Sequence, residues 1–162
     1  VMIPLFGFSS AASALVSNVM GEKRLSEVRT LIKRIVLMSL LATALFLPIL
    51  LAFPFKITSI YTDDLALIEG AVKILPVICA AMFFFSIAFI TFSSVTGTGK
   101  TLVTLSIEFI SVSIYLSFAY YFALTLNLSL ASIWCSEFIY FGFMGLLSIL
   151  YLKFGNWKNS MI

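Results

Sequence analysis

Five long apolar segments constrain the fold more than any other feature of this chain. They are residues 1–20, 35–55, 74–96, 102–126 and 128–152. The first three carry no charged side chain, and the last two carry one each, Glu108 and Glu137. Because about 20 apolar residues in a helix cross the ~30 Å hydrocarbon core of a bilayer, each segment predicts a transmembrane helix. No segment alternates apolar and polar residues as a membrane β-strand does. The sequence therefore predicts an all-α membrane protein with five transmembrane helices.

The composition excludes several classes of protein. Only 10% of the residues are charged and 62% are hydrophobic, whereas about a quarter of the residues in a soluble domain are charged. The net charge of +3 comes from too few basic residues to form a nucleic-acid-binding face. There is no histidine, and Cys79 and Cys135 lie in apolar segments, which argues against a disulfide scaffold and a Cys/His metal site. The spans offer no nucleophile–base pair, so we expect no enzyme and no bound cofactor.

The basic residues are divided unevenly between the connections. Two, Lys56 and Lys73, share one side with Asp63, Asp64 and Glu69. The other side receives eight: Lys23, Arg24, Arg29, Lys33, Arg34, Lys100, Lys153 and Lys158. The positive-inside rule predicts a cytoplasmic C-terminus and an outer position for Val1. A chain that starts inside a span with no basic leader reads as a fragment. If the true N-terminus is cytoplasmic, we expect an odd number of spans upstream.

The connections carry further expectations. After a helix stop at Gly21, the segment up to Arg34 reads as an amphipathic stretch at the membrane surface. Its apolar side chains are expected to face lipid, namely Leu25, Val28, Leu31 and Ile32. Thr62 or one of the two following aspartates is expected to cap a helix. The connections at 97–101 and around Asn127 are short, so the last three spans should be antiparallel neighbours. Residues 97–101 also look like the end of a P-loop, but they lack its first glycine and its preceding strand.

Several motifs together resemble one transporter family. Residues 4–18 read Pro-Leu-Phe-Gly-Phe-Ser-Ser-Ala-Ala-Ser-Ala-Leu-Val-Ser-Asn, with Gly21 following. This run resembles an even-numbered opening helix in a lobe of the MATE (multidrug and toxin extrusion) transporters. The turn Thr96-Gly97-Thr98-Gly99-Lys100-Thr101 is similar to the Gly-x-Gly-x-Thr that ends a lobe's fourth helix. Tyr61-Thr62-Asp63-Asp64 matches an outer-loop pattern, and Trp134, Glu137 and Tyr140 match the last span of bacterial members.

The resemblance implies a fold and an activity. Such transporters have twelve spans in two lobes, so the five spans here would be helices 8–12, most of a C-terminal lobe. The implied function is a secondary active antiporter in a bacterial inner membrane, exporting amphipathic or cationic compounds in exchange for Na⁺ or H⁺. The implied partners are the lipid bilayer, those compounds and an N-terminal lobe of the same chain. Some members carry an acidic residue midway along the tenth span, but residues 74–96 contain none, so that cation site is not expected here.

The candidate transport-pathway residues lie in the last two spans. On one, Thr104, Glu108, Ser111 and Tyr115 follow each other at helical spacing and share a face. On the other, Glu137 lies between Trp134 and Tyr140, three residues to either side. Ionisable groups inside spans are costly and usually face a cavity or a partner. The transport-pathway candidates are Glu108, Ser111, Tyr115, Glu137 and Tyr140, although buried packing groups are an equally open interpretation. The two glutamates lie at different depths, so direct pairing is not expected.

Four further residues are candidates for the wall of a substrate cavity. Phe85 and Phe89 belong to an aromatic-rich span and could stack on an organic cation. Ser10 and Ser17 belong to a small-residue stripe on the first span with Gly7, Ala14 and Gly21. Such stripes let helices approach closely, so packing is the plainer interpretation of both groups.

Two other functions stay open from the sequence alone. One is a flippase for lipid-linked oligosaccharide from a related superfamily, which should line its cavity with basic residues against a pyrophosphate. No lysine or arginine lies inside the five apolar segments, which favours drug-type substrates. The other is a non-transporting membrane scaffold, which a transport assay would distinguish.

Overall fold

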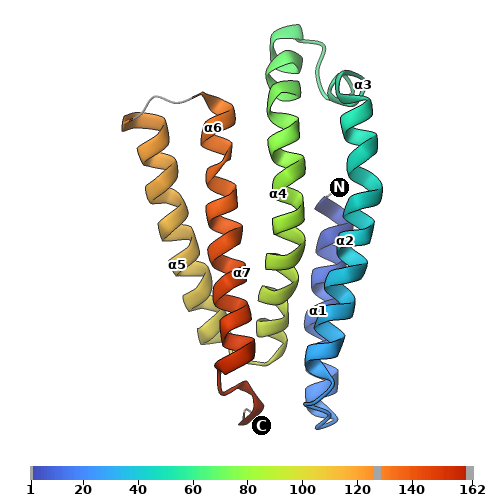
Figure 1. Ribbon diagram of the computed structural model, residues 1–162, viewed down its shortest axis with the longest axis vertical. Helices are drawn as coiled ribbons and strands as arrows, with labels where there is room; N and C mark the ends of the chain where they lie inside the picture. The colour runs from blue at the N-terminus through green and yellow to red at the C-terminus, as the bar shows by residue number, and fades with distance from the viewer. Residues whose placement is uncertain (1, 126–128, 160–162) are drawn as a thin grey trace.

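The computed structural model describes residues 2–125 and 129–159, and these form a bundle of helices without a strand (Figure 1). Within these described residues, five helices are long and apolar enough to cross a membrane. The elements are α1 (Met2–Gly21), α2 (Val28–Ala52), α3 (Pro54–Thr58), α4 (Leu65–Gly97), α5 (Thr101–Tyr120), the π-helical η1 (Tyr121–Thr125), α6 (Leu130–Trp134), α7 (Ser136–Phe154) and the 3₁₀-helical η2 (Trp157–Asn159). The predicted all-α membrane protein with five spans is confirmed. The expected turn around Asn127 and the placement of Val1 lie outside the described residues.

The central element is α4, which packs against each of the other α-helices. In the most apolar 18-residue stretch of α4, half of the residues are buried. The corresponding share is 17% in the span that begins with α5. In Figure 1, α4 stands between α7 on one side and α1 and α2 on the other, while α5 lies outermost beyond α7. The exposed surface is therefore largest on α5, and α4 supplies most of the bundle's interior.

The start of α4 confirms the expected helix cap and shows that the helix extends beyond the predicted apolar segment. The side chain of Asp64 caps the helix by accepting a hydrogen bond from the backbone N–H of Ala66 at 2.9 Å. Thr62 in turn accepts from the N–H of Asp64. The helix therefore begins at Leu65, well before the apolar segment that starts at residue 74. At 1.5 Å per residue, 33 residues make a helix of about 50 Å, which is longer than the hydrocarbon core.

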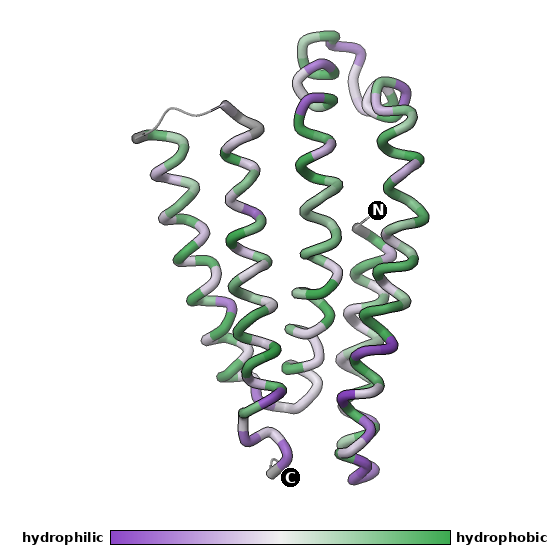
Figure 2. Tube along the Cα trace, in the orientation of Figure 1, coloured by the Kyte–Doolittle hydropathy of each residue, from purple (hydrophilic) through white to green (hydrophobic). Residues whose placement is uncertain are grey.

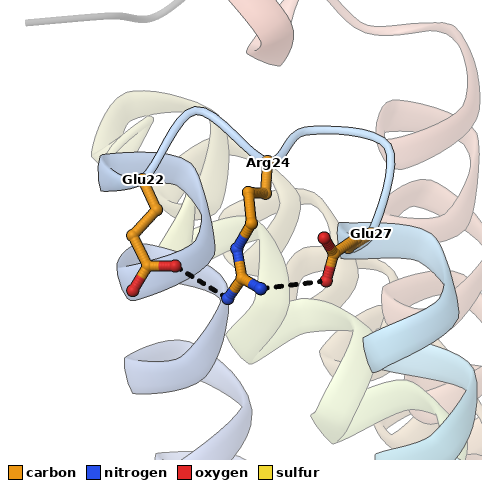
Figure 3. Close-up of polar contacts among 3 residues, drawn as sticks. All are labelled: Glu22, Arg24 and Glu27. Atoms are coloured by element: carbon orange, nitrogen blue, oxygen red, sulfur yellow. Dashed lines mark ion pairs between the residues drawn. The ribbon is translucent and has the colours of Figure 1, made fainter.

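The connection between α1 and α2 differs from its prediction. Arg24 forms ion pairs with Glu22 at 2.7 Å and Glu27 at 3.4 Å, which draws this connection together (Figure 3). The spanning helix α2 then starts at Val28, so there is no separate surface helix before it. Val28 and Ile32 are buried in the main core cluster, with Leu25 and Leu31 packed against it.

The expectation that these four side chains face lipid was wrong. The stretch continues into a spanning helix, and its apolar face packs against the core cluster while Arg29 and Lys33 remain exposed.

Small residues allow α4 to approach its neighbours closely. A Cβ atom at Gly97 would lie 2.5 Å from the backbone oxygen of Ser13 on α1, and one at Gly145 of α7 would lie 3.2 Å from Ala88. Hydroxyl pairs join the same helices: Ser9 to Ser93 at 2.6 Å between α1 and α4. The corresponding pair between α2 and α4 is Thr43 with Ser86, at 2.9 Å.

The predicted small-residue stripe on α1 lies on the exposed surface of the described bundle and not at a helix contact. Gly7, Ser10, Ala14, Ser17 and Gly21 are all exposed. A Cβ added at Gly7 or Gly21 would meet nothing within 4 Å. The stripe therefore makes no close helix contact within the described residues, and the close approaches lie at Gly97 and Gly145 instead.

The charged residues gather at the ends of the helices (Figure 2). The α1–α2 connection, the α4–α5 turn and the C-terminal segment all lie at the lower end in Figure 1. The eight basic residues that the sequence assigns to one side lie in these three segments and in the adjoining turns of α2 and α7, so we call this end the basic end. The 97–101 segment is a turn between α4 and α5, with Gly99 at φ +76°. The turn connects two spanning helices, in agreement with the rejection of a P-loop.

We expect Gly97→Ala to destabilise the bundle by about 1–3 kcal/mol, the usual cost of overpacking. The new methyl group would press on the Ser13 carbonyl, which is backbone and cannot swing aside. The measurement is the free energy of unfolding by SDS titration in detergent micelles. Gly7→Ala is the control, because its Cβ would meet open space. Equal stability of the two variants would show that α1 and α4 are not in close contact at Gly97.

Candidate functional site

The two glutamates of the last spans lie in one polar contact chain between α5 and α7. The hydroxyl of Tyr140 on α7 donates a hydrogen bond to Oε1 of Glu108 on α5 at 2.8 Å. The rings of Tyr140 and Tyr115 lie against each other, with centroids 5.7 Å apart. The Tyr115 hydroxyl interacts with the carboxylate of Glu137 and with the Ser136 side chain. Thus Glu108, Tyr140, Tyr115 and Glu137 follow one another across the helix pair.

Helical spacing and antiparallel packing produce this order. On α5, Glu108 and Tyr115 are seven residues apart, which is two turns and the same face. On α7, Glu137 and Tyr140 are three residues apart, which is nearly one turn. Because α5 and α7 run in opposite directions (Figure 1), each glutamate meets the tyrosine of the other helix. The two carboxylates do not pair directly, because the phenols of Tyr140 and Tyr115 lie between them. This agrees with the expectation that was based on their different depths.

Each of the four side chains is half-buried. A charge in an apolar environment is costly unless it is paired or hydrogen-bonded. A phenol donates a hydrogen bond to a carboxylate and has an oxygen that can also accept one. The arrangement can therefore hold each carboxyl group in its charged or its protonated form without leaving it unpartnered. It offers oxygen atoms only, which suits a proton or a hard cation.

The remaining transport-pathway candidate takes no part in these contacts. Ser111 lies on the same helix as Glu108 and is fully buried. Its hydroxyl donates to the backbone oxygen of Ile107 at 2.8 Å, within its own helix. The hydroxyl of Thr104, at the start of the stripe, likewise donates to the backbone oxygen of Lys100. These two hydroxyls are satisfied locally and belong to helix packing.

An aromatic cluster connects this site to the rest of the bundle. Phe141 packs edge-on against Phe85 of α4 and touches Tyr140, with ring centroids 5.0 Å apart in both cases. Phe85 stacks on Phe89 at 4.7 Å, and Phe6 of α1 packs edge-on against both of them. The sequence did not point to Phe6 or Phe141, because neither stands out among 17 phenylalanines.

The four cavity-wall candidates occupy two different environments. Phe85 is buried in the centre of the aromatic cluster and Phe89 is half-buried beside it. Ser10 and Ser17 are exposed on α1. Phe85 is held as a core residue of the aromatic cluster, whereas the two serines lie on the exposed surface of α1.

A family model described as MatE matches residues 1–121 of the chain. The chain belongs to the MatE family. The match covers α1 to α5, including Glu108 and Tyr115, and ends before α7 with Glu137 and Tyr140. The resemblance seen in the sequence motifs is therefore confirmed.

A curated relative aligns over nearly the whole of this MatE chain. It is the probable multidrug resistance protein NorM of Thermotoga maritima, 27% identical over 161 residues. The alignment covers 99% of this chain but 35% of the relative, so the chain spans about a third of the relative's length. No solved structure matches the chain significantly.

A double-mutant cycle tests the contact between Glu108 and Tyr140. Glu108→Leu and Tyr140→Phe each remove the hydrogen bond, so their effects on unfolding free energy should be non-additive by about 0.5–2 kcal/mol. The measurement is SDS titration of the two single variants and the double variant in micelles. The same cycle with Tyr120→Phe, whose side chain is exposed, should give additive effects. A coupling of zero for Glu108 and Tyr140 would contradict the contact.

Proposed function

We propose that this sequence is part of a secondary active antiporter that exports amphipathic or cationic compounds in exchange for Na⁺ or H⁺. Membership of the MatE family supports the proposal, as does the similarity to a protein described as a probable multidrug resistance protein. We further propose that the five spans are helices 8–12 of a twelve-helix, two-lobe transporter. The alignment with about a third of the relative's length is consistent with this division.

The observation that carries the proposal is the pair of glutamates linked through Tyr140 and Tyr115. Counted along the helix, Glu108 lies about 10 Å from the start of α5 at Thr101. Glu137 lies about 8 Å from the start of its span at Ser132. An antiporter needs a group inside the membrane whose charge is compensated by the coupling ion in one state. When that ion has left, another partner must compensate the charge. A carboxylate with a phenol partner at this depth meets that requirement.

The proposed orientation follows from the basic end. Because lysine and arginine are enriched in cytoplasmic connections, we propose that the basic end, with the C-terminus, lies on the cytoplasmic side of a bacterial inner membrane. The N-terminal lobe of the same polypeptide is the proposed structural partner. Besides the coupling ion we propose no cofactor.

Replacing the glutamates tests the function. In the full-length protein, Glu137→Gln should reduce ion-coupled efflux by roughly tenfold or more, a modest part of the ~10²–10⁴-fold that a positioned acid–base group contributes. Glu108→Gln should have the same effect or a smaller one. Glutamine keeps the shape and the hydrogen bonding of the side chain but cannot change charge. The measurement is dye efflux from membrane vesicles with either a pH gradient or a sodium gradient imposed, at matched protein levels.

Glu69→Gln is the matched control, because Glu69 is exposed near the start of α4. This substitution should leave efflux unchanged. Loss of efflux under one gradient alone would identify the coupling ion. Parental efflux in both site variants would make Glu108 and Glu137 packing groups. A parent protein that moves no dye under either gradient would contradict the transport proposal and favour a scaffold.

A further inference from the structure

A groove runs between α2, α4 and α7 at the basic end of the bundle. Its volume is about 590 Å³, within the ~300–1,000 Å³ of small-molecule sites. Both flanking helices, α2 and α7, pack against α4, so α4 forms its floor, with Ile87 and Thr91. At its lower end, the Arg29 guanidinium on α2 donates a hydrogen bond to the backbone oxygen of Lys153 on α7 at 3.0 Å. This bond closes the groove at the level where the spans end.

The walls of the groove above that bond are apolar. On α2 they are formed by Val36, Leu37 and Leu40, and on α7 by Ile149 and Leu152. Thr91 is the one polar side chain on the floor, and its hydroxyl is bound within α4 to the backbone oxygens of Ile87 and Ala88. From Arg29 to Leu40 the groove follows α2 for about 16 Å. That length matches one leaflet, about half of the ~30 Å hydrocarbon core.

Three cations converge on the lower end of this groove: Arg29, Lys33 and Lys153. In the part of the chain that the structure describes, the ion pairs are those of Arg24 with Glu22 and Glu27. Arg24, in the neighbouring α1–α2 connection, has two carboxylates of its own (Figure 3). Among the described residues, the groove cations make their polar contacts with a backbone oxygen and with the ring of Phe154, over which Lys153 Nζ lies at 5.0 Å. Their charge is left for an anion.

We propose that this groove binds one anionic phospholipid. An acyl chain lies along Leu37, Leu40 and Ile149, and the headgroup phosphate lies among the three cations. An apolar channel one leaflet long, ending in uncompensated positive charge at headgroup depth, has the two chemistries of such a lipid in the right order. A zwitterionic lipid would bring a positive group next to the same cations. The inference concerns α2, α4 and α7 and does not depend on the proposed transport activity.

Titration of the full-length protein with lipid tests the proposal. Native mass spectrometry of detergent-purified protein would compare phosphatidylglycerol with phosphatidylcholine of identical acyl chains. The parent should bind phosphatidylglycerol more tightly. The variant R29Q/K33Q/K153Q should lose that preference by roughly 100-fold, since each basic residue near the membrane surface contributes about fivefold. The variant K23Q/K100Q/K158Q removes the same charge from the same end outside the groove, and it should keep the preference.

A second pair of variants keeps every charge and tests the groove itself. Leu40→Trp fills the groove and should weaken phosphatidylglycerol binding, whereas Leu41→Trp changes an adjacent exposed residue outside it and should not. Equal binding of the two lipids by the parent would overturn the proposal. So would an unchanged preference in R29Q/K33Q/K153Q, or equal losses in both charge variants. Absence of lipid binding, with the groove covered by another segment of the polypeptide, would overturn it as well.

Discussion

The close approach of other helices to α4 is the constraint on which the rest of the structure depends. Inside a bilayer, apolar side chains gain little by leaving lipid for protein, so close packing and interhelical hydrogen bonds must hold the helices together. Gly97 lets α4 meet the Ser13 backbone of α1, and Gly145 lets α7 meet Ala88. The hydroxyl pairs Ser9–Ser93 and Thr43–Ser86 then join α1 and α2 to α4. Larger residues at the two glycines would separate α4 from α1 and α7.

The polar contacts between α5 and α7 follow from that packing. Because α7 lies on α4, its opposite side is available to α5, which is the least buried span. Glu108 on α5 would be an isolated carboxylate in an apolar environment if α7 were shifted along its axis. With α7 in its present register, Tyr140 reaches Glu108, and Tyr115 reaches Glu137. Phe141, the neighbour of Tyr140, packs at the same time on Phe85 of α4. The position of the tyrosine is thus coupled to the core.

The sequence predicts the features that depend on a single segment. Spans follow from apolar length, the cap at Asp64 follows from local chemistry, and the antiparallel order of α4 and α5 follows from the short turn at 97–101. Two features that depend on the packing of separate segments were missed or wrong. Val28 and Ile32 lie in a stretch whose pattern suits a lipid surface, and only the presence of the core cluster buries them. Glu108 and Tyr140 are 32 residues apart in the chain, and their pairing depends on the register between two helices, which neither helix encodes alone.

Acidic and basic side chains have different partners in this structure, and this difference distinguishes the two candidate sites. The carboxylates within the spans have hydroxyl partners, whereas the groove cations Arg29, Lys33 and Lys153 have no carboxylate partner in the described part of the chain. Both sites use α7, but Tyr140 and Lys153 are 13 residues apart, about 20 Å along the helix. Energetic effects at sites farther apart than about 7–10 Å usually add. Lipid bound at the basic end would therefore stabilise the bundle through α2 and α7 without changing the contacts of Glu108. Any coupling between the two sites would require movement of α7 as a whole.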